Sequence, residues 1–298
     1  MNPPPTVLVT GATSQLGVFL LPRLETEGMN ITALSRSFSG GSVQVTEKVR
    51  WQPPSNHGPA EFDFFVSCGP LDLASELVKN NEVLRKAVVF STTSVFTKPN
   101  SADAKERETI SRIAAQEKRL KSTCADRGVA LVIIRPTLIY GCGMDSNVSL
   151  LLRLGEKTGF IPLSRSALGL RQPVHADDLA QLAVNALKQE TGELLEGAAC
   201  GASTLQFREM AARIAQCGTR KIRLLHLPAP LLSALVRTAS LLGPWKGINP
   251  EMVRRQSEDM VFDDTTFKTH LDWQPREFKP GPEDFQIPPE MSKYQNPA

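Results

Sequence analysis

Tyrosine and charge of one sign are both scarce in this chain of 298 residues. It has only two tyrosines, Tyr140 and Tyr294, and aromatic residues make up 6% of the sequence. The 34 Lys and Arg residues nearly balance the 31 Asp and Glu residues, and the net charge of +3 is too small to indicate a nucleic-acid surface. Hydrophobic residues make up 41% and charged residues 22%, which is typical of a folded protein with one large domain or two interleaved lobes.

Paired cysteines are also missing. The five cysteines are an odd number, and they form neither a CxxC pair nor a Cys/His set with zinc-ligand spacing: Cys68, Cys124, Cys142, Cys200 and Cys217. We therefore expect reduced thiols, no metal site and a cytoplasmic location. The first residues contain no charged region followed by an apolar run, so no signal peptide is expected.

Long hydrophobic runs are absent as well. The most hydrophobic stretch, residues 224–245, contains Arg237 and three prolines, so we predict no membrane span. Its leucines fit the apolar face of a helix that begins near Pro230. We expect this helix to pack on the body of the protein, and a membrane-surface or partner-binding helix is the alternative.

Short apolar runs alternate with helical patterns along the chain. Strands are predicted at residues 6–10, 31–35, 49–51, 62–67, 87–91, 129–135, 193–198 and 221–225, and helices at 15–27, 72–80, 103–126, 146–157, 176–188, 205–217 and 230–242. Alternation of this kind indicates a parallel sheet with right-handed crossovers. The predicted fold class is α/β: a Rossmann-type doubly wound parallel sheet with a smaller C-terminal substrate lobe. We assign residues 1–140 and about 171–200 to the Rossmann domain, and about 141–170 and 201–298 to the lobe.

The strongest local signal is a glycine turn between the first strand and the first helix. The strand ends before Gly11, and the helix has Gly17 in its first turn. Gly11 permits a tight turn, Gly17 allows close packing of helix on strand, and the free amides at the helix start can hold a pyrophosphate. The pattern predicts dinucleotide binding, and a tight turn without a ligand is the alternative.

The end of the second strand bears on the choice of dinucleotide. NAD sites usually carry Asp or Glu there to bind the ribose 2′-hydroxyl, but residues 34–37 read Leu-Ser-Arg-Ser. Arg36, followed by Ser37, could instead pair with a 2′-phosphate. We therefore predict that NADP(H) is preferred and that NAD(H) is possible. The alternative is that Arg36 is a solvated loop arginine.

Four segments in order resemble one known family. Residues 10–17 are similar to a TGxxGxxG turn with Ser14 as the middle residue, 90–96 to SSxxVYG, 134–141 to RPxxxYG, and 171–180 to R-x-x-VHVxDLA. Residues 271–275, Leu-Asp-Trp-Gln-Pro, are similar to the LGWxP ending of nucleotide-sugar epimerases. The chain thus resembles the extended short-chain dehydrogenase/reductase family, the NAD-dependent epimerase/dehydratase group, over nearly its whole length. The motifs are specific to the superfamily but not to one reaction.

The resemblance implies roles for individual residues. Thr92 is implied to be catalytic, with its hydroxyl on the substrate oxygen that is oxidised or reduced, and Arg171 to bind the substrate diphosphate. Thr137 is implied to approach the nicotinamide and the substrate. The implied cofactor-binding residues are Gly11, Thr13, Ser14, Gln15, Leu16 and Gly17 at the pyrophosphate, Ser67, Cys68 and Gly69 along the cofactor, and Pro136 at the nicotinamide.

The YxxxK element of the family, a tyrosine acid/base with its lysine partner, is missing from the helix at 103–126. When the family's downstream Glu is aligned with Gln116, Glu108 takes the position of the tyrosine and Arg112 that of the lysine. When that Glu is aligned with Glu117, Thr109 and Ile113 take these two positions instead. Neither alignment supplies a tyrosine or a lysine.

Three interpretations follow. The protein is an atypical epimerase/dehydratase-type oxidoreductase, in which Arg112 replaces the lysine and Thr92 relays the proton, acting by hydride transfer on a nucleotide sugar or a related carbonyl compound. Alternatively it is a non-catalytic NADP(H)-binding sensor or regulator. In the third interpretation the helix serves assembly only, as in the homodimer interfaces that the resemblance implies.

Overall fold

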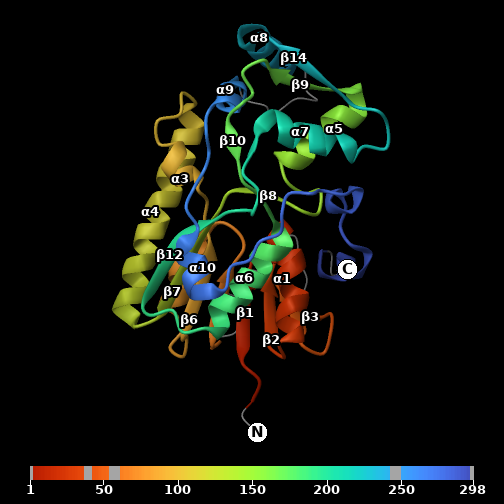
Figure 1. Cartoon of the computed structure of the whole chain (residues 1–298). Coiled ribbons are helices and arrows are strands. Elements are labelled where there is room, and N and C mark those ends of the chain that lie inside the picture. Colours follow the sequence, from red (N-terminus) through yellow and green to blue (C-terminus); the bar gives the residue numbers. More distant parts are fainter. Residues whose placement is uncertain (1–2, 37–41, 54–60, 242–249, 296–298) are drawn as a thin grey trace.

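The computed structural model describes residues 3–36, 42–53, 61–241 and 250–295. One end of the molecule is built around an eight-stranded sheet (Figure 1). Its strand order is β12-β7-β6-β5-β1-β2-β4-β3, and neighbouring strands are parallel except β3 and β4. The strands are β1 (Thr6–Thr10), β2 (Asn30–Leu34), β3 (Val43–Gln44), β4 (Val49–Gln52), β5 (Phe64–Ser67), β6 (Lys86–Phe90), β7 (Ala130–Pro136) and β12 (Leu194–Ala199).

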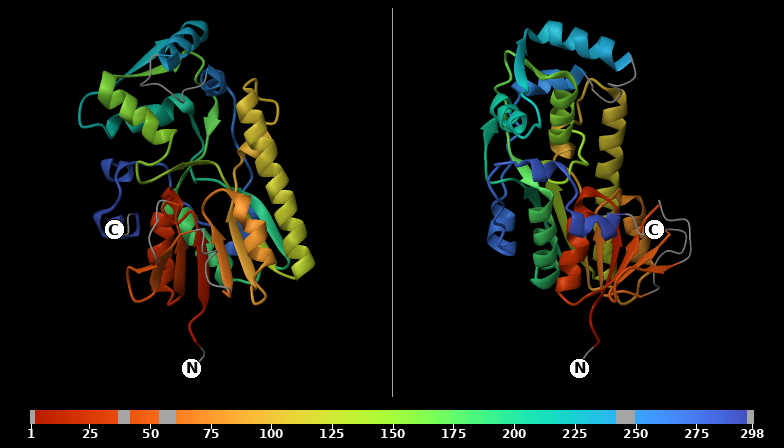
Figure 2. Two further views of the ribbon diagram at one scale, coloured as in Figure 1. Left: turned by 180° about the vertical axis from the view of Figure 1, so that it is seen from behind. Right: turned by 90° about the vertical axis from the view of Figure 1, so that its right-hand side faces the viewer.

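Helices cover both faces of this sheet. α1 (Gln15–Thr26) and α6 (Ala176–Lys188) pack side by side on one face, and α2 (Ala74–Lys79) and α4 (Ala104–Arg127) cover the other (Figure 2). Alternate residues of a strand enter different cores: Val7 packs in the cluster with α1 and α6, and Leu8 in the cluster with α2 and α4. Burial on both faces explains the continuous apolar runs. The predicted α/β fold class, a doubly wound Rossmann-type sheet, is confirmed.

The sheet has a topological switch point between β1 and β5. From β1 the chain builds outward through β2 and β4 on one side and through β5, β6, β7 and β12 on the other. Open α/β sheets bind their ligands outside the carboxyl ends of the strands at such a point. Gly11 follows β1 and Gly69 follows β5 there, and the two glycines lie in close contact.

A smaller lobe lies beyond the carboxyl edge of the sheet (Figure 1). It contains α5 (Val148–Thr158), α7 (Phe207–Gln216), α8 (Ala229–Leu241) and α9 (Pro250–Arg254), together with the parallel pair β9 (Phe160–Ser164) and β14 (Arg223–Leu227). Two short pairs join it to the sheet domain: β8 (Leu138–Tyr140) with β11 (Pro173–His175), and β10 (Leu170–Arg171) with β13 (Leu205–Gln206). The sequence pattern did not predict β9, because Pro162 interrupts a strand signal.

The C-terminal part of the chain returns to the Rossmann layers. α10 (Thr265–Leu271) packs against β12 and α6, and Tyr294 is buried against α1 in the same core. The predicted domain division, with residues 141–170 and 201–298 in the smaller lobe, stays a prediction. The C-terminal elements that it assigns to the lobe contact the sheet domain. Of the helices in the described ranges, none combines the length and the apolar character that crossing a membrane requires.

Candidate functional site

The glycine turn has the geometry that its two glycines require. Gly11 has φ +65°, and a Cβ there would lie 2.6 Å from the backbone nitrogen of Gly69. A Cβ on Gly17 would lie 2.1 Å from the carbonyl oxygen of Ala12. Ser14 caps α1 by accepting a hydrogen bond from the Gly17 amide at 3.2 Å. Any side chain at Gly11 or Gly17 would therefore push apart the turn, the β5 end and the helix.

Gln15 is the residue of the turn whose polar group lacks a partner. Its Nε2 atom is buried and makes no hydrogen bond within the described part of the chain. It belongs to the first residue of a 12-residue helix, whose amino end favours anions. A buried donor without an acceptor is rare in a folded protein, so the turn fits the pyrophosphate or carboxamide oxygens of a dinucleotide. Thr13 is half-buried beside it, and the Leu16 side chain is buried in the core.

The residues after β2 and β5 were also predicted to contact a cofactor. Arg36 is exposed at the end of β2, and Ser37 lies outside the described residues. The Ser67 hydroxyl accepts a hydrogen bond from Thr10 at 3.0 Å and is buried. Burial raises the pKa of the Cys68 thiol, so it stays a neutral, inert group after β5.

A cavity of about 500 Å³ lies between the sheet edge and the smaller lobe. The fold brings five of the predicted site residues into its wall: Gln15, Thr92, Pro136, Thr137 and Arg171. Much of the remaining lining is apolar and includes Met144, Phe207, Met210, Met252, Met260 and Phe262. The cavity therefore suits a ligand that has both a polar and an apolar part, because unbranched Met side chains adapt to irregular shapes.

Local hydrogen bonds fix the polar wall. Thr92 Oγ1 accepts from the Ser94 amide at 3.1 Å, which leaves its own proton free to be donated. Thr93 donates to the Pro136 carbonyl at 3.0 Å, and Thr137 donates to the Gln172 carbonyl. The ends of β6 and β7 are thus tied together under the cavity.

Arg171 is a buried cation whose hydrogen bonds go to carbonyl oxygens. It is 5% exposed and donates to the carbonyls of Leu170 and Glu258, each at 2.7 Å, and to that of Arg255. Burial lowers its pKa to about 10, so it remains charged at neutral pH. The guanidinium also lies 5.3 Å from the Phe207 ring centroid. Its hydrogen bonds within the described part of the chain all go to neutral carbonyls, and the carboxylates of Glu258 and Asp259 act on it only through their charge. The guanidinium therefore adds positive charge to this wall.

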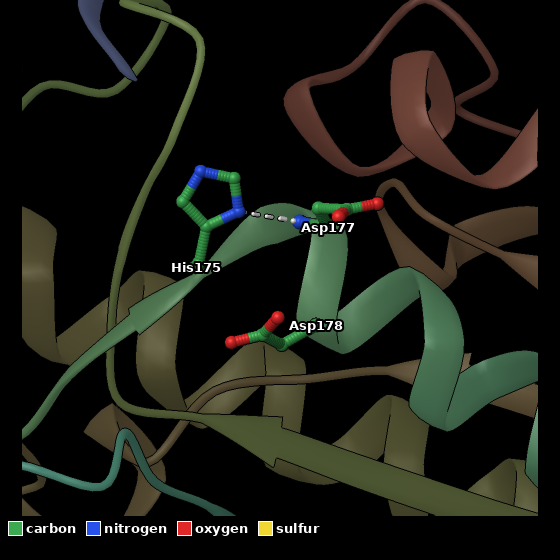
Figure 3. A group of neighbouring side chains, drawn as sticks. All are labelled: His175, Asp177 and Asp178. Carbon is green, nitrogen blue, oxygen red and sulfur yellow. Dashed lines mark hydrogen bonds between the residues drawn. The ribbon is translucent and has the colours of Figure 1, made fainter. Parts of the chain in front are cut away.

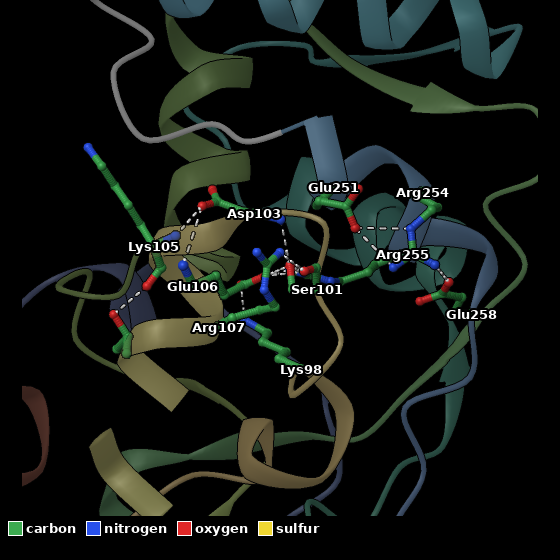
Figure 4. A network of polar contacts seen from close by, with 11 residues as sticks. Lys98, Ser101, Asp103, Lys105, Glu106, Arg107, Glu251, Arg254, Arg255 and Glu258 are labelled. Atoms are coloured by element: carbon green, nitrogen blue, oxygen red, sulfur yellow. Dashed lines mark hydrogen bonds and ion pairs between the residues drawn. The ribbon is translucent and has the colours of Figure 1, made fainter. Parts of the chain in front are cut away.

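Charged residues at the cavity rim join the lobe to α4 (Figure 4). Arg255 pairs with Glu106 at 3.0 Å and also contacts Ser101. Lys98 binds the same carboxylate at 2.9 Å. Lys98 and the cavity residue Asp145 belong to no sequence motif; Asp145 accepts a hydrogen bond from the Ser149 amide in the first turn of α5.

The helix α4 does not bring Arg112 to the cavity. Arg112 is exposed on the outer side of α4 and is not among the cavity-lining residues. The inward carboxylate of this helix is Glu117, which accepts from Ser91 and pairs with Arg135 at 2.6 Å.

Both tyrosines lie away from the cavity lining. Tyr140 is buried edge-on against the rings of His175 and Phe278, and burial raises its pKa. Tyr294 donates a 2.5 Å hydrogen bond to Glu25 on α1. Neither phenol is therefore placed to act on a ligand in this cavity.

Three potential metal ligands gather at the start of α6: His175, Asp177 and Asp178 (Figure 3). The Asp177 carboxylate pairs with Arg23 at 2.6 Å and with Arg276, which also binds Asp178. His175 Nδ1 accepts from the Asp177 amide and caps the helix. These pairs occupy the ligand atoms, and the cluster ties α1, α6 and the C-terminal segment together.

Comparison with known proteins identifies the fold. No protein-family model matches the chain, and no curated protein sequence matches it. Among solved structures it is similar to UDP-N-acetylglucosamine 4-epimerase from Bacillus cereus (TM-score 0.67, 16% identity, 95% of each chain covered). It is also similar to dTDP-glucose 4,6-dehydratase from Bacillus anthracis in complex with NAD (TM-score 0.65, 14% identity, 97% of each chain). A third is MoeE5 in complex with UDP-glucose and NAD (TM-score 0.64, 15% identity, 97% of this chain and 98% of that chain).

These structural neighbours are nucleotide-sugar epimerases and dehydratases. The chain has their fold over nearly its whole length. At such low identity the likeness concerns the fold and not the individual site residues. The dehydratase and MoeE5 were both solved with NAD, so they do not support the NADP preference predicted from Arg36.

Proposed function

We propose that the protein binds a nicotinamide dinucleotide at the switch point and acts by hydride transfer on a nucleotide sugar or related carbonyl compound in the cavity. The observation that carries this proposal is the position of Gln15. It belongs to the glycine turn and also lines the cavity, which supports a single site for dinucleotide and substrate. When bound there, the nicotinamide supplies or accepts the hydride.

Three features of the cavity support this class of substrate. Thr92 has a free hydroxyl proton to donate to a carbonyl oxygen. The Arg171 guanidinium favours an anionic group such as a diphosphate. The apolar wall offers a surface for a nucleobase. The UDP-glucose complex of the neighbour MoeE5 is consistent with such a ligand.

A fluorescence titration with NADH and with NADPH tests the cofactor site. We expect Gly11→Ala to weaken binding at least about tenfold, because its Cβ would collide with Gly69. Gly192→Ala is the matched control: Gly192 also has a positive φ, +67°, but no atom lies within 4 Å of its Cβ position. Equal binding by both variants, or no binding by the parent protein, would contradict the proposal.

Substitution of Arg36 in the same titration decides between the two dinucleotides. The neighbours favour NAD, whereas the exposed guanidinium at the end of β2 favours a 2′-phosphate. If Arg36 binds that phosphate, Arg36→Ala weakens NADPH binding alone. If Arg36→Ala leaves the ratio of the NADPH and NADH affinities unchanged, Arg36 is a solvated side chain that does not bind the cofactor.

A non-catalytic sensor of NAD(P)(H) is the second candidate. Its support is that the described residues lining the cavity include no tyrosine, histidine or cysteine. A catalyst changes the absorbance of bound NADH or NAD when a nucleotide sugar is added, whereas a sensor binds without that change.

A further inference from the structure

The helix α8 exposes leucines on the side where a surface helix usually carries charge. Leu231 and Leu235, one turn apart, are 49% and 48% exposed. Ala234 and Thr238 are exposed at the same helical spacing, so the outer stripe is almost entirely apolar. Leu232 on the inner side is only 2% exposed. α8 is therefore apolar on both sides, and its outer stripe lacks a covering partner in the described chain.

The stripe lies at one extremity of the molecule. α8 and β14 form the end farthest from the N-terminus, and α8 runs across that end (Figures 1 and 2). β14 adds Leu225, which is 43% exposed, and its register with β9 puts Leu225 beside Pro162 on the face opposite the buried Ile161 and Leu163. Exposed apolar side chains gathered at one end of a molecule mark an interaction surface.

The surroundings of the stripe are positively charged. Residues 210–250 contain no Asp or Glu but have six cations: Arg213, Arg220, Lys221, Arg223, Arg237 and Lys246. Arg213 is bound to Glu209, and Arg220 to the Glu156 carbonyl. Lys221 and Arg223 are exposed on β14 and the segment before it. Glu251, on the helix α9 that packs on α8, is paired with Arg254 at 2.9 Å. A partner for this face therefore needs negative charge beside an apolar layer.

A second copy of the chain does not meet that need. In a two-fold dimer the same face meets itself, so the exposed cations Lys221 and Arg223 of the two copies would lie on one shared interface. An anionic bilayer meets it: leucines enter the boundary between headgroups and acyl chains, and the cations contact lipid phosphates. We propose that α8 docks this protein on an anionic phospholipid surface.

Vesicle flotation tests the docking surface with the full chain. The vesicles are phosphatidylcholine alone, or phosphatidylcholine mixed with phosphatidylglycerol. We expect binding to the mixed vesicles only, weakened by salt and reduced about tenfold in L231Q/L235Q. Lys221→Gln with Arg223→Gln reduces binding by a similar factor through lost charge. Leu194→Gln, which changes an equally exposed leucine on β12, is the matched control and keeps binding.

Other outcomes overturn the proposal. One is binding to phosphatidylcholine alone at the same strength; another is unchanged binding of L231Q/L235Q. A third is a dimer in light scattering that L231Q/L235Q dissociates, with no flotation, which assigns the stripe to a second copy. Equal urea midpoints of the variants show that these results do not reflect unfolding, and the docking result is independent of dinucleotide binding.

Discussion

At the scale of single residues, Thr92 has a geometry suited to donating a proton, but its chemistry is weak. Its oxygen accepts from the Ser94 amide, and the hydroxyl proton remains available in the cavity. A threonine hydroxyl is a poor acid at neutral pH, whereas the tyrosine of the resembled family is tuned for that task. The proposed turnover therefore depends on the hydrogen bond that Thr92 donates to the substrate oxygen.

We expect Thr92→Ala to lower turnover about 100-fold or more, with little change in dinucleotide affinity. Thr92→Ser should restore much of the rate, because it keeps the hydroxyl. Thr97→Ala is the control, since Thr97 also lines the cavity. The measurement is the absorbance change at saturating nucleotide sugar, and an unchanged rate in Thr92→Ala excludes the proton-relay role.

At the scale of elements, one carboxylate joins α4 to the smaller lobe. Burial alone would raise the pKa of Glu106, but hydrogen bonds from Arg255, Lys98 and Ser101 outweigh it and lower the pKa to about 2. A carboxyl group with a folded pKa below its ordinary 4.5 stabilises the folded state above about pH 4.5. That stabilisation is lost as the pH falls through 4.5 toward 2.

Glu106→Gln should therefore lower the free energy of unfolding by about 2 kcal/mol at neutral pH. The variant should also lose less stability than the parent protein between pH 4.5 and 2, since it has no carboxylate to protonate. Urea unfolding across this range measures both effects. Glu108→Gln, on the exposed side of the same helix, should leave the pH dependence unchanged.

At the scale of the whole molecule, the C-terminal segment ties the lobe and the sheet into one unit. Trp273 follows α10 and is buried, and its Nε1 donates to the Cys200 carbonyl at 3.2 Å and to Asp264 at 3.1 Å. Arg276 binds the two carboxylates at the start of α6. The C-terminal segment that follows the smaller lobe thus completes the core of the sheet domain. The lobe and the sheet domain should therefore unfold together.

Trp273→Phe should cost about 2–4 kcal/mol, because it removes buried ring volume and leaves two buried acceptors unpaired. We expect one cooperative urea transition, shifted to lower midpoint, by circular dichroism and by hydrogen exchange alike. The exposed neighbour Gln274→Ala should not shift it. Two separate transitions would show that the lobe folds by itself.

The sheet was predictable because its signal is local. Runs such as β7, with alternate side chains entering the two cores, are apolar at nearly every position and can be recognised without knowing their neighbours. The two- and three-residue strands β3, β8, β10, β11 and β13 were not predicted, since so few residues carry no periodicity. Their pairing depends on partners far away in the chain.

The glycine turn was predictable from the sequence alone. Gly11 and Gly17 act within one strand–turn–helix unit, so their meaning is contained in a few residues. Only the tertiary structure decided that Gln15, Thr92 and Arg171 share a cavity, that Arg112 lies outside it, and that α8 exposes its leucines. Contacts of this kind join residues that are far apart in sequence, and their formation depends on how whole layers pack.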